Sequence, residues 1–286
     1  MRRSTIPPSV CITEFTDPGC PWAYSAEPFR LRLAWLYGED VYFEHRLVGL
    51  AESPDEYAEK GFTPAKQSHA FKKIAAEHRM PIDTRERPRM AATVPACRAV
   101  VAARVHAHGR EGALLRALRL RQFRGELLDE QSTIDGAATD AGLDPAQLRE
   151  WMGTEEVERA LREDMGEARE PAPAARVLDD KLANWSGGRR YTCPSYEIQR
   201  TADGVRIAVP GFQPFPVYDV VTANLVPGLE RRDPPESVEE VLDWAGEPLA
   251  TQEVAVVSDI PFLEAREALG RAARETPLGT DGFWSL

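Results

Sequence analysis

The chain has 286 residues, four cysteines and a formal net charge of −11 at pH 7. This length exceeds that of most single domains, so we expect one core with an insertion or an appended module. With 43% hydrophobic and 28% charged residues the composition is that of an ordinary globular protein, and no apolar run approaches the roughly 18 residues of a membrane span. The acidic charge repels phosphate backbones, which argues against general nucleic-acid binding.

The N-terminus carries two arginines with no apolar segment behind them, so we expect no secretory signal and a cytoplasmic protein without a membrane partner. The four cysteines are far apart, form no Cys-x-x-Cys pair and have no histidine at zinc-finger spacing: Cys11, Cys20, Cys97 and Cys193. We therefore expect no metal site and no disulfide-rich scaffold. In a reducing compartment, the ordinary expectation for such thiols is burial without reaction.

The start of the chain has the pattern of a β-α-β unit. Alternating β-branched residues predict a strand over residues 10–16, and Asp17-Pro18-Gly19 predicts a turn after it. Cys20-Pro21 opens a helix that continues to about residue 37, with the proline in the first turn, where its missing N–H costs nothing. A second strand is predicted over residues 41–48.

The next block, residues 52–176, shows no convincing strand and is predicted to be an all-helical insertion. Helical periods cover residues 70–79, 91–108, 111–123, 132–141, 145–152 and 154–169. Because residues 91–107 are rich in Ala and Val nearly all round, this helix is predicted to be the buried one. After a Pro-Ala-Pro break, a short helix is predicted over residues 176–185.

Strand character returns after Ser186-Gly187-Gly188, within the segment 177–229. Strands over 194–199 and 204–209 flank a short connection with a turn signal, which predicts a hairpin. A helix over 216–225 follows. The order of elements is thus β-α-β, a helical block, then β-β-α.

Residues 230–286 follow a charged, proline-rich linker and form a separate C-terminal module. Three predicted helices (238–244, 250–257 and 261–274) precede a turn between two short apolar pieces, which is typical of a winged helix. Such folds often bind DNA, but this segment has five arginines against 13 acidic residues, whereas a phosphate-facing surface needs a basic excess. We therefore expect a packing or lid module.

The order of the elements, with Cys-Pro-Trp opening the first helix, resembles the thioredoxin fold of the DsbA family, and within it the cytosolic FrnE-like branch. The resemblance covers about residues 9–229 and is carried by these motifs: Asp17-Pro18-Gly19-Cys20-Pro21-Trp22, Thr192-Cys193-Pro194-Ser195 and Gly211-Phe212-Gln213-Pro214. It implies a thioredoxin-like core in two parts, residues 1–51 and 177–229, divided by the helical insertion. It also implies a thiol–disulfide oxidoreductase that acts on protein or small-molecule thiols.

The resemblance also assigns roles to individual residues. Cys20 stands at a helix start, where free N–H groups and the helix dipole stabilise a thiolate, and is the expected nucleophile. Pro194 matches the cis-proline that faces the nucleophile and exposes the backbone of Cys193 to an extended ligand. Glu14 matches a buried acid that takes part in proton transfer, although a Glu with its head in solvent at a strand end fits the sequence equally well. Ligand contacts are expected from the residues that follow the nucleophile, which are Pro21, Trp22, Ala23 and Tyr24.

One departure from the family pattern decides which mechanisms remain. The family's second active cysteine is replaced by Ala23, so Cys20 cannot be released from a mixed disulfide by its usual neighbour. Three routes stay open. In the first, Cys20 exchanges with a low-molecular-weight thiol such as glutathione or mycothiol, and no cofactor is held permanently. In the second, Cys193 serves as the resolving thiol. In the third, the fold has lost redox chemistry. In the last case it binds a ligand, or it resembles the kappa-class glutathione transferases and hydroxychromene carboxylate isomerases, which use a thiol cofactor.

Overall fold

A computed structural model describes residues 7–286, so the arginines on which the expectation of no secretory signal rests lie outside the described part. Within residues 7–286, no helix is both long and apolar enough to cross a bilayer. The elements in chain order are β1 (Val10–Thr16), α1 (Pro21–Ser25), α2 (Glu27–Tyr37), η1 (Gly38–Asp40), β2 (Val41–Leu47), α3 (Pro54–Glu59), α4 (Pro64–His78), α5 (Val94–His106), α6 (Glu111–Arg124), α7 (Gln131–Asp140), α8 (Pro145–Met152), α9 (Glu155–Ala168), η2 (Ala175–Lys181), β3 (Leu182–Trp185), β4 (Gly188–Tyr191), β5 (Ser195–Arg200), β6 (Arg206–Val209), α10 (Phe215–Leu225), α11 (Val238–Ala245), β7 (Leu249–Ala250), α12 (Thr251–Ser258), α13 (Phe262–Ala272), β8 (Arg274–Leu278) and β9 (Asp281–Ser285).

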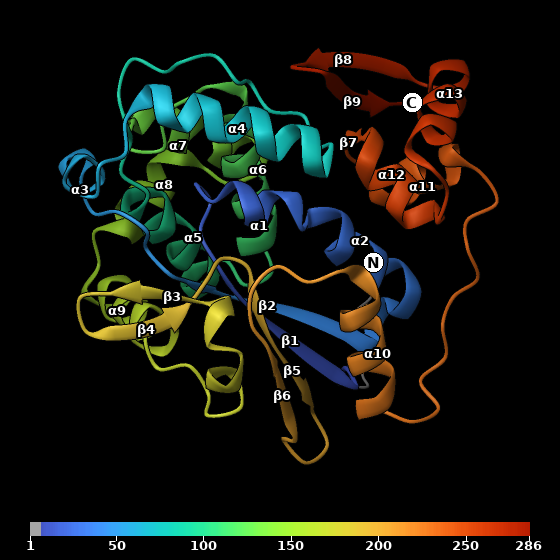
Figure 1. Ribbon diagram of the computed structural model, residues 1–286, viewed down its shortest axis with the longest axis horizontal. Helices are drawn as coiled ribbons and strands as arrows, with labels where there is room; N and C mark the ends of the chain where they lie inside the picture. The colour runs from blue at the N-terminus through green and yellow to red at the C-terminus, as the bar shows by residue number, and fades with distance from the viewer. Residues whose placement is uncertain (1–6) are drawn as a thin grey trace.

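The centre of the molecule is a four-stranded mixed sheet in the order β2-β1-β5-β6 (Figure 1). β1 pairs in parallel with β2 and antiparallel with β5, and β6 continues the sheet antiparallel to β5. Val10 and Ile12 of β1 are fully buried against Leu33 and Tyr37 of α2 and Tyr218 of α10. The predicted thioredoxin-like fold is therefore confirmed.

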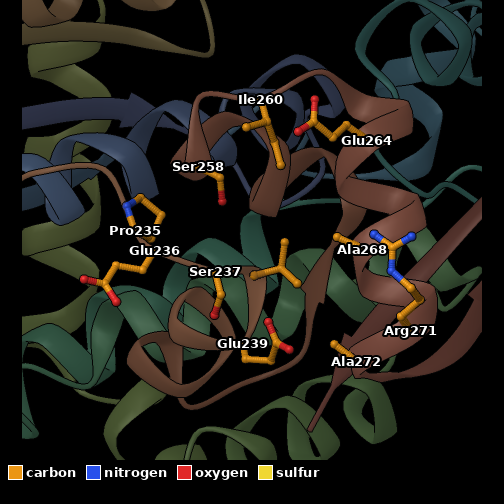
Figure 2. A pocket seen from close by; sticks show the side chains of 11 residues that line it. Pro235, Glu236, Ser237, Glu239, Ser258, Ile260, Glu264, Ala268, Arg271 and Ala272 are labelled. Carbon is orange, nitrogen blue, oxygen red and sulfur yellow. The ribbon is translucent and has the colours of Figure 1, made fainter.

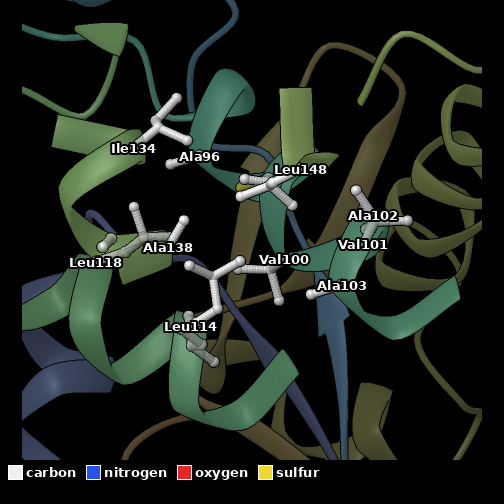
Figure 3. Close-up of a cluster of buried hydrophobic side chains, with 14 of the residues drawn as sticks. Ala96, Val100, Val101, Ala102, Ala103, Leu114, Leu118, Ile134, Ala138 and Leu148 are labelled. Atoms are coloured by element: carbon white, nitrogen blue, oxygen red, sulfur yellow. The ribbon is translucent and has the colours of Figure 1, made fainter. Parts of the chain in front are cut away.

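The helical insertion runs from α3 to α9 and has its own apolar core (Figure 3). Its centre is α5, in which Ala96, Val100 and Val101 are almost completely buried among side chains of α6, α7, α8 and α9. A helix that is apolar all round must be covered on every side, and α5 is the buried helix that the composition predicts. Asp164 of α9 accepts a hydrogen bond from the Leu47 amide at 3.0 Å, which fixes the insertion to the end of β2.

Three of the predicted helices differ in the structure. The first helix is broken at Ala26 because Pro28 in the first turn of α2 cannot donate to the preceding turn, so α1 and α2 are separate helices. α4 begins at Pro64, with Thr63 as its N-cap, instead of at residue 70. The helix predicted over 176–185 is wrong: η2 covers its first part, and β3 pairs with β4 in a hairpin whose tight turn uses Gly188 at φ 133°.

The C-terminal module has the winged-helix order α11-β7-α12-α13-β8-β9, with a small antiparallel sheet in the order β7-β9-β8. It packs against α2 of the thioredoxin-like core (Figure 1). Leu31 and Trp35 of α2 lie in the same apolar cluster as Val241 and Leu242 of α11, and the Trp35 indole donates to the carbonyl of Asp233 at 2.9 Å. The module is thus a packed part of the molecule.

A chain of buried ion pairs joins these three parts. Arg119 of α6 contacts Glu14 of β1, with 3.0 Å between Nη2 and Oε1, and also contacts Glu27 of α2. Arg116, one turn earlier on α6, lies 3.8 Å from Glu27 and 2.7 Å from Glu253 of α12. Burial raises the pKa of Glu27, but the nearby arginines lower it more, so this carboxyl stays ionised. Alternating signs let these charges remain buried together.

Replacing Arg119 by methionine is expected to destabilise the protein severely. The change keeps much of the side-chain volume but leaves Glu14 and Glu27 as buried charges without their shared partner, which costs about 3–5 kcal/mol. Urea unfolding at neutral pH measures this loss. The matched control is Arg121→Met on the same helix, whose pairs with Glu126 and Asp140 are partly exposed and worth about 1 kcal/mol or less. Equal losses in the two variants would contradict the structural role given to the buried chain.

Candidate active site around Cys20

Cys20 is the residue that precedes α1, where the backbone changes from extended to helical. It has φ −82° and ψ 116°, and Pro21 follows as the first helical residue. The Cys20 amide donates to the carbonyl of Asp17 at 3.1 Å, which closes the Asp-Pro-Gly turn beneath it. The backbone amides of Ala23 and Trp22 lower the pKa of its thiol. The local sequence therefore places the thiol against free N–H groups, as the turn and the proline predict.

Cys193, although 173 positions away, is brought into contact with Cys20. The Cys20 thiol donates a hydrogen bond to the Cys193 carbonyl oxygen at 3.2 Å, and the Cys193 side chain is close enough to the Cys20 sulfur for the two thiols to shift each other's pKa. The peptide bond between Cys193 and Pro194 is cis, as the family resemblance implies. Both thiols are free and buried, with 6% and 8% of their surfaces exposed. The structure thus brings together the three residues Cys20, Cys193 and Pro194.

The two thiols have opposite pKa shifts. The hydrogen bond from Cys193 is the largest cause that lowers the pKa of Cys20; burial opposes it, and the amides of Ala23 and Trp22 add to it. The pKa of Cys193 is raised well above its ordinary value by burial and by the adjacent Cys20 sulfur. Burial also raises the pKa of Cys97, and it raises that of Cys11 to about 11. Of the four cysteines, Cys20 alone is favoured as a thiolate.

Asp17 is a site residue that the sequence analysis missed because its motif was interpreted only as a turn. Its carboxylate is fully buried and accepts hydrogen bonds from the Gly19 amide (2.7 Å), the Leu50 amide (2.9 Å) and the Thr93 hydroxyl (2.8 Å). Burial raises the pKa of Asp17, and its charge raises that of Cys20. Asp17 therefore ties the nucleophile's turn to the insertion and limits how far the thiol pKa falls.

Two of the predicted site residues have other roles in the structure. Glu14 is buried, so the alternative of a carboxylate in solvent is wrong; it pairs with Arg119 and lies 3.6 Å from Nε2 of His45. The carboxylate with the largest effect on the Cys20 thiol is that of Asp17 instead. Tyr24 is fully buried and its hydroxyl donates to the Pro81 carbonyl at 3.0 Å, so it supports the site from below and does not face a ligand.

The surface beside Cys20 is aromatic. Trp22 is 39% exposed and meets the ring edges of His78 (5.1 Å between centroids) and Phe212 (6.0 Å), the latter from the Gly-Phe-Gln-Pro motif. Pro21 is half-buried, whereas Ala23 is 1% exposed and lies under the site, so Ala23 is not a ligand contact. Trp22 and Pro21 thus form the part of the predicted ligand surface that is accessible.

Tyr57 of α3 is a second residue missed from the sequence, because that helix was not predicted. Burial raises its pKa, and negative charge on Asp17 and Cys20 raises it further, so the phenol lies within the electrostatic field of the nucleophile. The Ser53 N-cap and Pro54 were the available signals for this helix. Tyr57 is therefore a residue of the helical insertion that lies close enough to Asp17 and Cys20 to respond to their charge.

A pocket of about 440 Å³ lies away from Cys20, in the C-terminal module (Figure 2). It is lined by Ser237 and Glu239 from the start of α11, by Ser258 and by Glu264 and Arg271 of α13. None of its lining residues is a cysteine or a predicted site residue. Over residues 7–286, no cluster of three His, Cys, Asp or Glu side chains is arranged to hold a metal ion.

This geometry matches a known family. A family model described as a DSBA-like thioredoxin domain matches residues 11–190, more than half of the chain, and the chain belongs to this family. The matched segment contains the turn before Cys20, α1 and the helical insertion. It ends before Cys193 and does not include the C-terminal module.

Solved structures with the same fold have low sequence identity to this chain. A probable DsbA oxidoreductase from Streptomyces coelicolor is 20% identical, with a TM-score of 0.55 over 79% of this chain and 93% of that one. The cytosolic disulfide reductase DsbM from Pseudomonas aeruginosa is 16% identical, with a TM-score of 0.53 over 76% of this chain and all of that one. A search among curated proteins gives no significant match. These likenesses establish the thioredoxin-like fold.

The reaction of Cys20 with iodoacetamide is expected to rise with pH at a lower midpoint than that of an ordinary cysteine, near 8.5. The thiolate is the reactive form, and a lowered pKa moves its formation to lower pH. In Cys193→Ala the midpoint moves upward, because the hydrogen bond that stabilises the thiolate most is lost. Peptide mapping assigns the reaction to Cys20, and Cys11→Ala is the control. A midpoint that is the same with and without Cys193 would contradict this electrostatic account.

Proposed function

We propose that this protein is a thiol–disulfide oxidoreductase in which Cys20 is the nucleophile and Cys193 is the resolving thiol. The observation that carries the proposal is the contact between the two cysteines, with a lowered pKa on Cys20 and a raised pKa on Cys193. In the wider DsbA family, the resolving thiol stands three positions after the first, as the second cysteine of Cys-x-x-Cys. Here that position is the buried Ala23, and the second thiol reaches the nucleophile from the loop before β5 instead.

In the first step, the thiolate of Cys20 attacks one sulfur of a substrate disulfide. A bond forms between that sulfur and Cys20, the substrate's S–S bond breaks, and the leaving thiolate takes a proton from solvent. The lowered pKa of Cys20 favours the reactive thiolate. Trp22 and Pro21 form the accessible surface on which the substrate is held, and the Cys193 backbone lies beside the reacting sulfur.

In the second step, the thiol of Cys193 loses its proton and attacks the Cys20 sulfur of the mixed disulfide. A bond forms between Cys20 and Cys193, and the second substrate thiolate leaves and is protonated. The substrate disulfide has then gained two electrons, and the protein dithiol has lost them. A low-molecular-weight thiol such as glutathione or mycothiol returns the pair to the dithiol state by two exchanges, forming its own disulfide. The same steps in reverse oxidise a substrate dithiol.

The two cysteines are predicted to form a bridge under mild oxidation. Treating the full chain with an equimolar small disulfide and mapping its peptides by mass should show Cys20 linked to Cys193. In Cys193→Ser the mixed disulfide on Cys20 should persist, at least tenfold longer than in the wild type, because no thiol is placed to resolve it. Cys11→Ser is the matched control, since Cys11 has a raised pKa and a half-buried position on β1.

Three outcomes would contradict the proposal. Oxidation that leaves both thiols free removes Cys193 as the resolving group. A reaction that needs a saturable thiol cofactor and survives Cys20→Ser would assign the site to the transferase or isomerase class instead. Absence of turnover with any disulfide would indicate a ligand-binding protein.

A further inference from the structure

The two edges of the central sheet differ in how their backbone is bonded. At the β2 edge, Arg104 of the insertion donates to the His45 carbonyl at 2.6 Å. Asp164 of the insertion accepts from the Leu47 amide at 3.0 Å. At the opposite edge, β6 is the last strand of the sheet, and no further strand among residues 7–286 pairs with it (Figure 1). The outer side of β6 is therefore a template on which another strand can pair.

The outward-pointing backbone groups of β6 belong to Arg206 and Ala208. At the start of the hairpin, the Arg200 amide donates to the Val205 carbonyl at 2.8 Å, so the backbone of Val205 points toward β5. Successive residues of an antiparallel strand alternate in this direction. The N–H and C=O groups of Arg206 and Ala208 therefore point away from β5, whereas those of Ile207 point toward it.

The same edge exposes apolar side chains. Val205 and Ile207 are 45% and 39% exposed. Ile207 is paired with Ile198, which belongs to the apolar cluster beneath α2 and α10, so both isoleucines stand on this face of the sheet. An exposed apolar edge strand promotes association with another chain.

The outer flank of α10 continues this apolar surface. α2 packs on β2 and α10 packs on β5, so the two helices lie side by side on one face of the sheet. Asp219 of α10 accepts a hydrogen bond from Tyr37 of α2 at 2.5 Å, which shows the side of α10 that faces α2. Val217 lies two positions earlier, about 160° away around the helix axis. The exposed Val217 therefore faces the β6 edge.

A second copy of the chain is complementary to this edge in one register. When β6 pairs antiparallel with the β6 of a second copy around a two-fold axis at Ile207, Arg206 of each copy stands opposite Ala208 of the other. Each such pair exchanges two backbone hydrogen bonds. Ile207 then meets its own equivalent, and Ile198 of each copy extends the row of isoleucines across the joined sheet.

The charges on the other face are complementary in the same register. Glu197 of β5 is paired with Ala208 and accepts a hydrogen bond from Arg206 of its own chain at 2.6 Å. Arg206 of the second copy stands beyond Ala208, whose small side chain leaves room for the guanidinium to approach Glu197. Each glutamate then lies between two arginines, so joining the copies brings opposite charges together.

We propose that the β6 edge is the interface of a two-fold dimer of this chain, in which the two central sheets join into one. The contact consists of one short strand and one helix flank, less than the roughly 800 Å² per copy of a standard interface, so the dimer is a weak one. β6 runs parallel to β1, because both are antiparallel to β5. The two Cys20 sites therefore lie at opposite ends of the joined sheet, and the dimer does not depend on the proposed function.

Sedimentation velocity of the full chain, over a concentration series through the micromolar range, tests for this dimer. Ile207→Lys should raise the dissociation constant by more than about tenfold, because like charges then meet at the two-fold axis. Leu263→Lys is the matched control, since Leu263 is 75% exposed on α13 in the C-terminal module. It should dimerise as the wild type does.

A cysteine cross-link tests the register. Ile207→Cys places two sulfurs at a pair that shares no backbone hydrogen bonds, where side chains approach most closely, so mild oxidation should link two copies through position 207. Val205→Cys is the control for register, because the two positions 205 are about 13 Å apart along the edge and should not link to each other. Peptide mapping distinguishes these links from those of the native cysteines.

Three results would overturn the proposed interface. One is a chain that stays monomeric up to its highest soluble concentration. The second is a dimer whose dissociation constant is the same in Ile207→Lys and Leu263→Lys, which would assign association to another surface. The third is cross-linking of Val205→Cys in place of Ile207→Cys, which would exclude this register. An unreactive Cys20 would refute the proposed function and leave all of these expectations unchanged.

Discussion

The buried chain of charges from Glu14 through Arg119, Glu27 and Arg116 to Glu253 is the constraint on which the arrangement of the molecule depends. Each charge is at most 4% exposed, so each needs its neighbours to remain ionised. The chain joins the central strand, the helical insertion, the second helix of the core and the appended module. A carboxylate at the position where the family resemblance implies a proton-transfer group is here held in a structural ion pair.

The ion pair between Glu14 and Arg119 fixes β1 against α6. This contact also positions the Asp17-Pro18-Gly19 turn that follows β1. Asp17 joins that turn to the insertion through Leu50 and Thr93, and Cys20 follows with its sulfur against the Cys193 carbonyl. The result is a pair of thiols with opposite electrostatic preferences. The lowered pKa of Cys20 favours its thiolate, and the raised pKa of Cys193 favours its thiol. In the proposed mechanism, the loop before β5 carries the second sulfur, because the helix has Ala23 at the position of the family's second cysteine.

Much of the fold could be predicted from the sequence, because it depends on local patterns. The β-α-β start, the apolar helix α5 and the winged-helix order each have a clear periodicity or turn signal. The position of Cys20 before a helix was predictable for the same reason, since a cysteine before a proline at a helix start has a local physical meaning. The contact of Cys20 with Cys193 was an inference from the resemblance.

What could not be predicted depends on contacts distant in sequence. Glu14 was assigned to the active sulfur because nothing local indicates that Arg119 of another segment pairs with it. Tyr24 is buried by Phe123 and Pro81, which come from the insertion. In the short helix predicted over 176–185, the last four residues instead form strand β3, because its partner β4 satisfies the backbone there.

The central claim, that Cys20 and Cys193 form one redox pair, is tested most directly by the intact mass of the full chain equilibrated in glutathione buffers of increasing oxidising strength. The account predicts that the main oxidised species is lighter than the reduced chain by two hydrogens and carries no glutathione. An oxidised species that instead gains one glutathione on Cys20, with Cys193 still free, would contradict it.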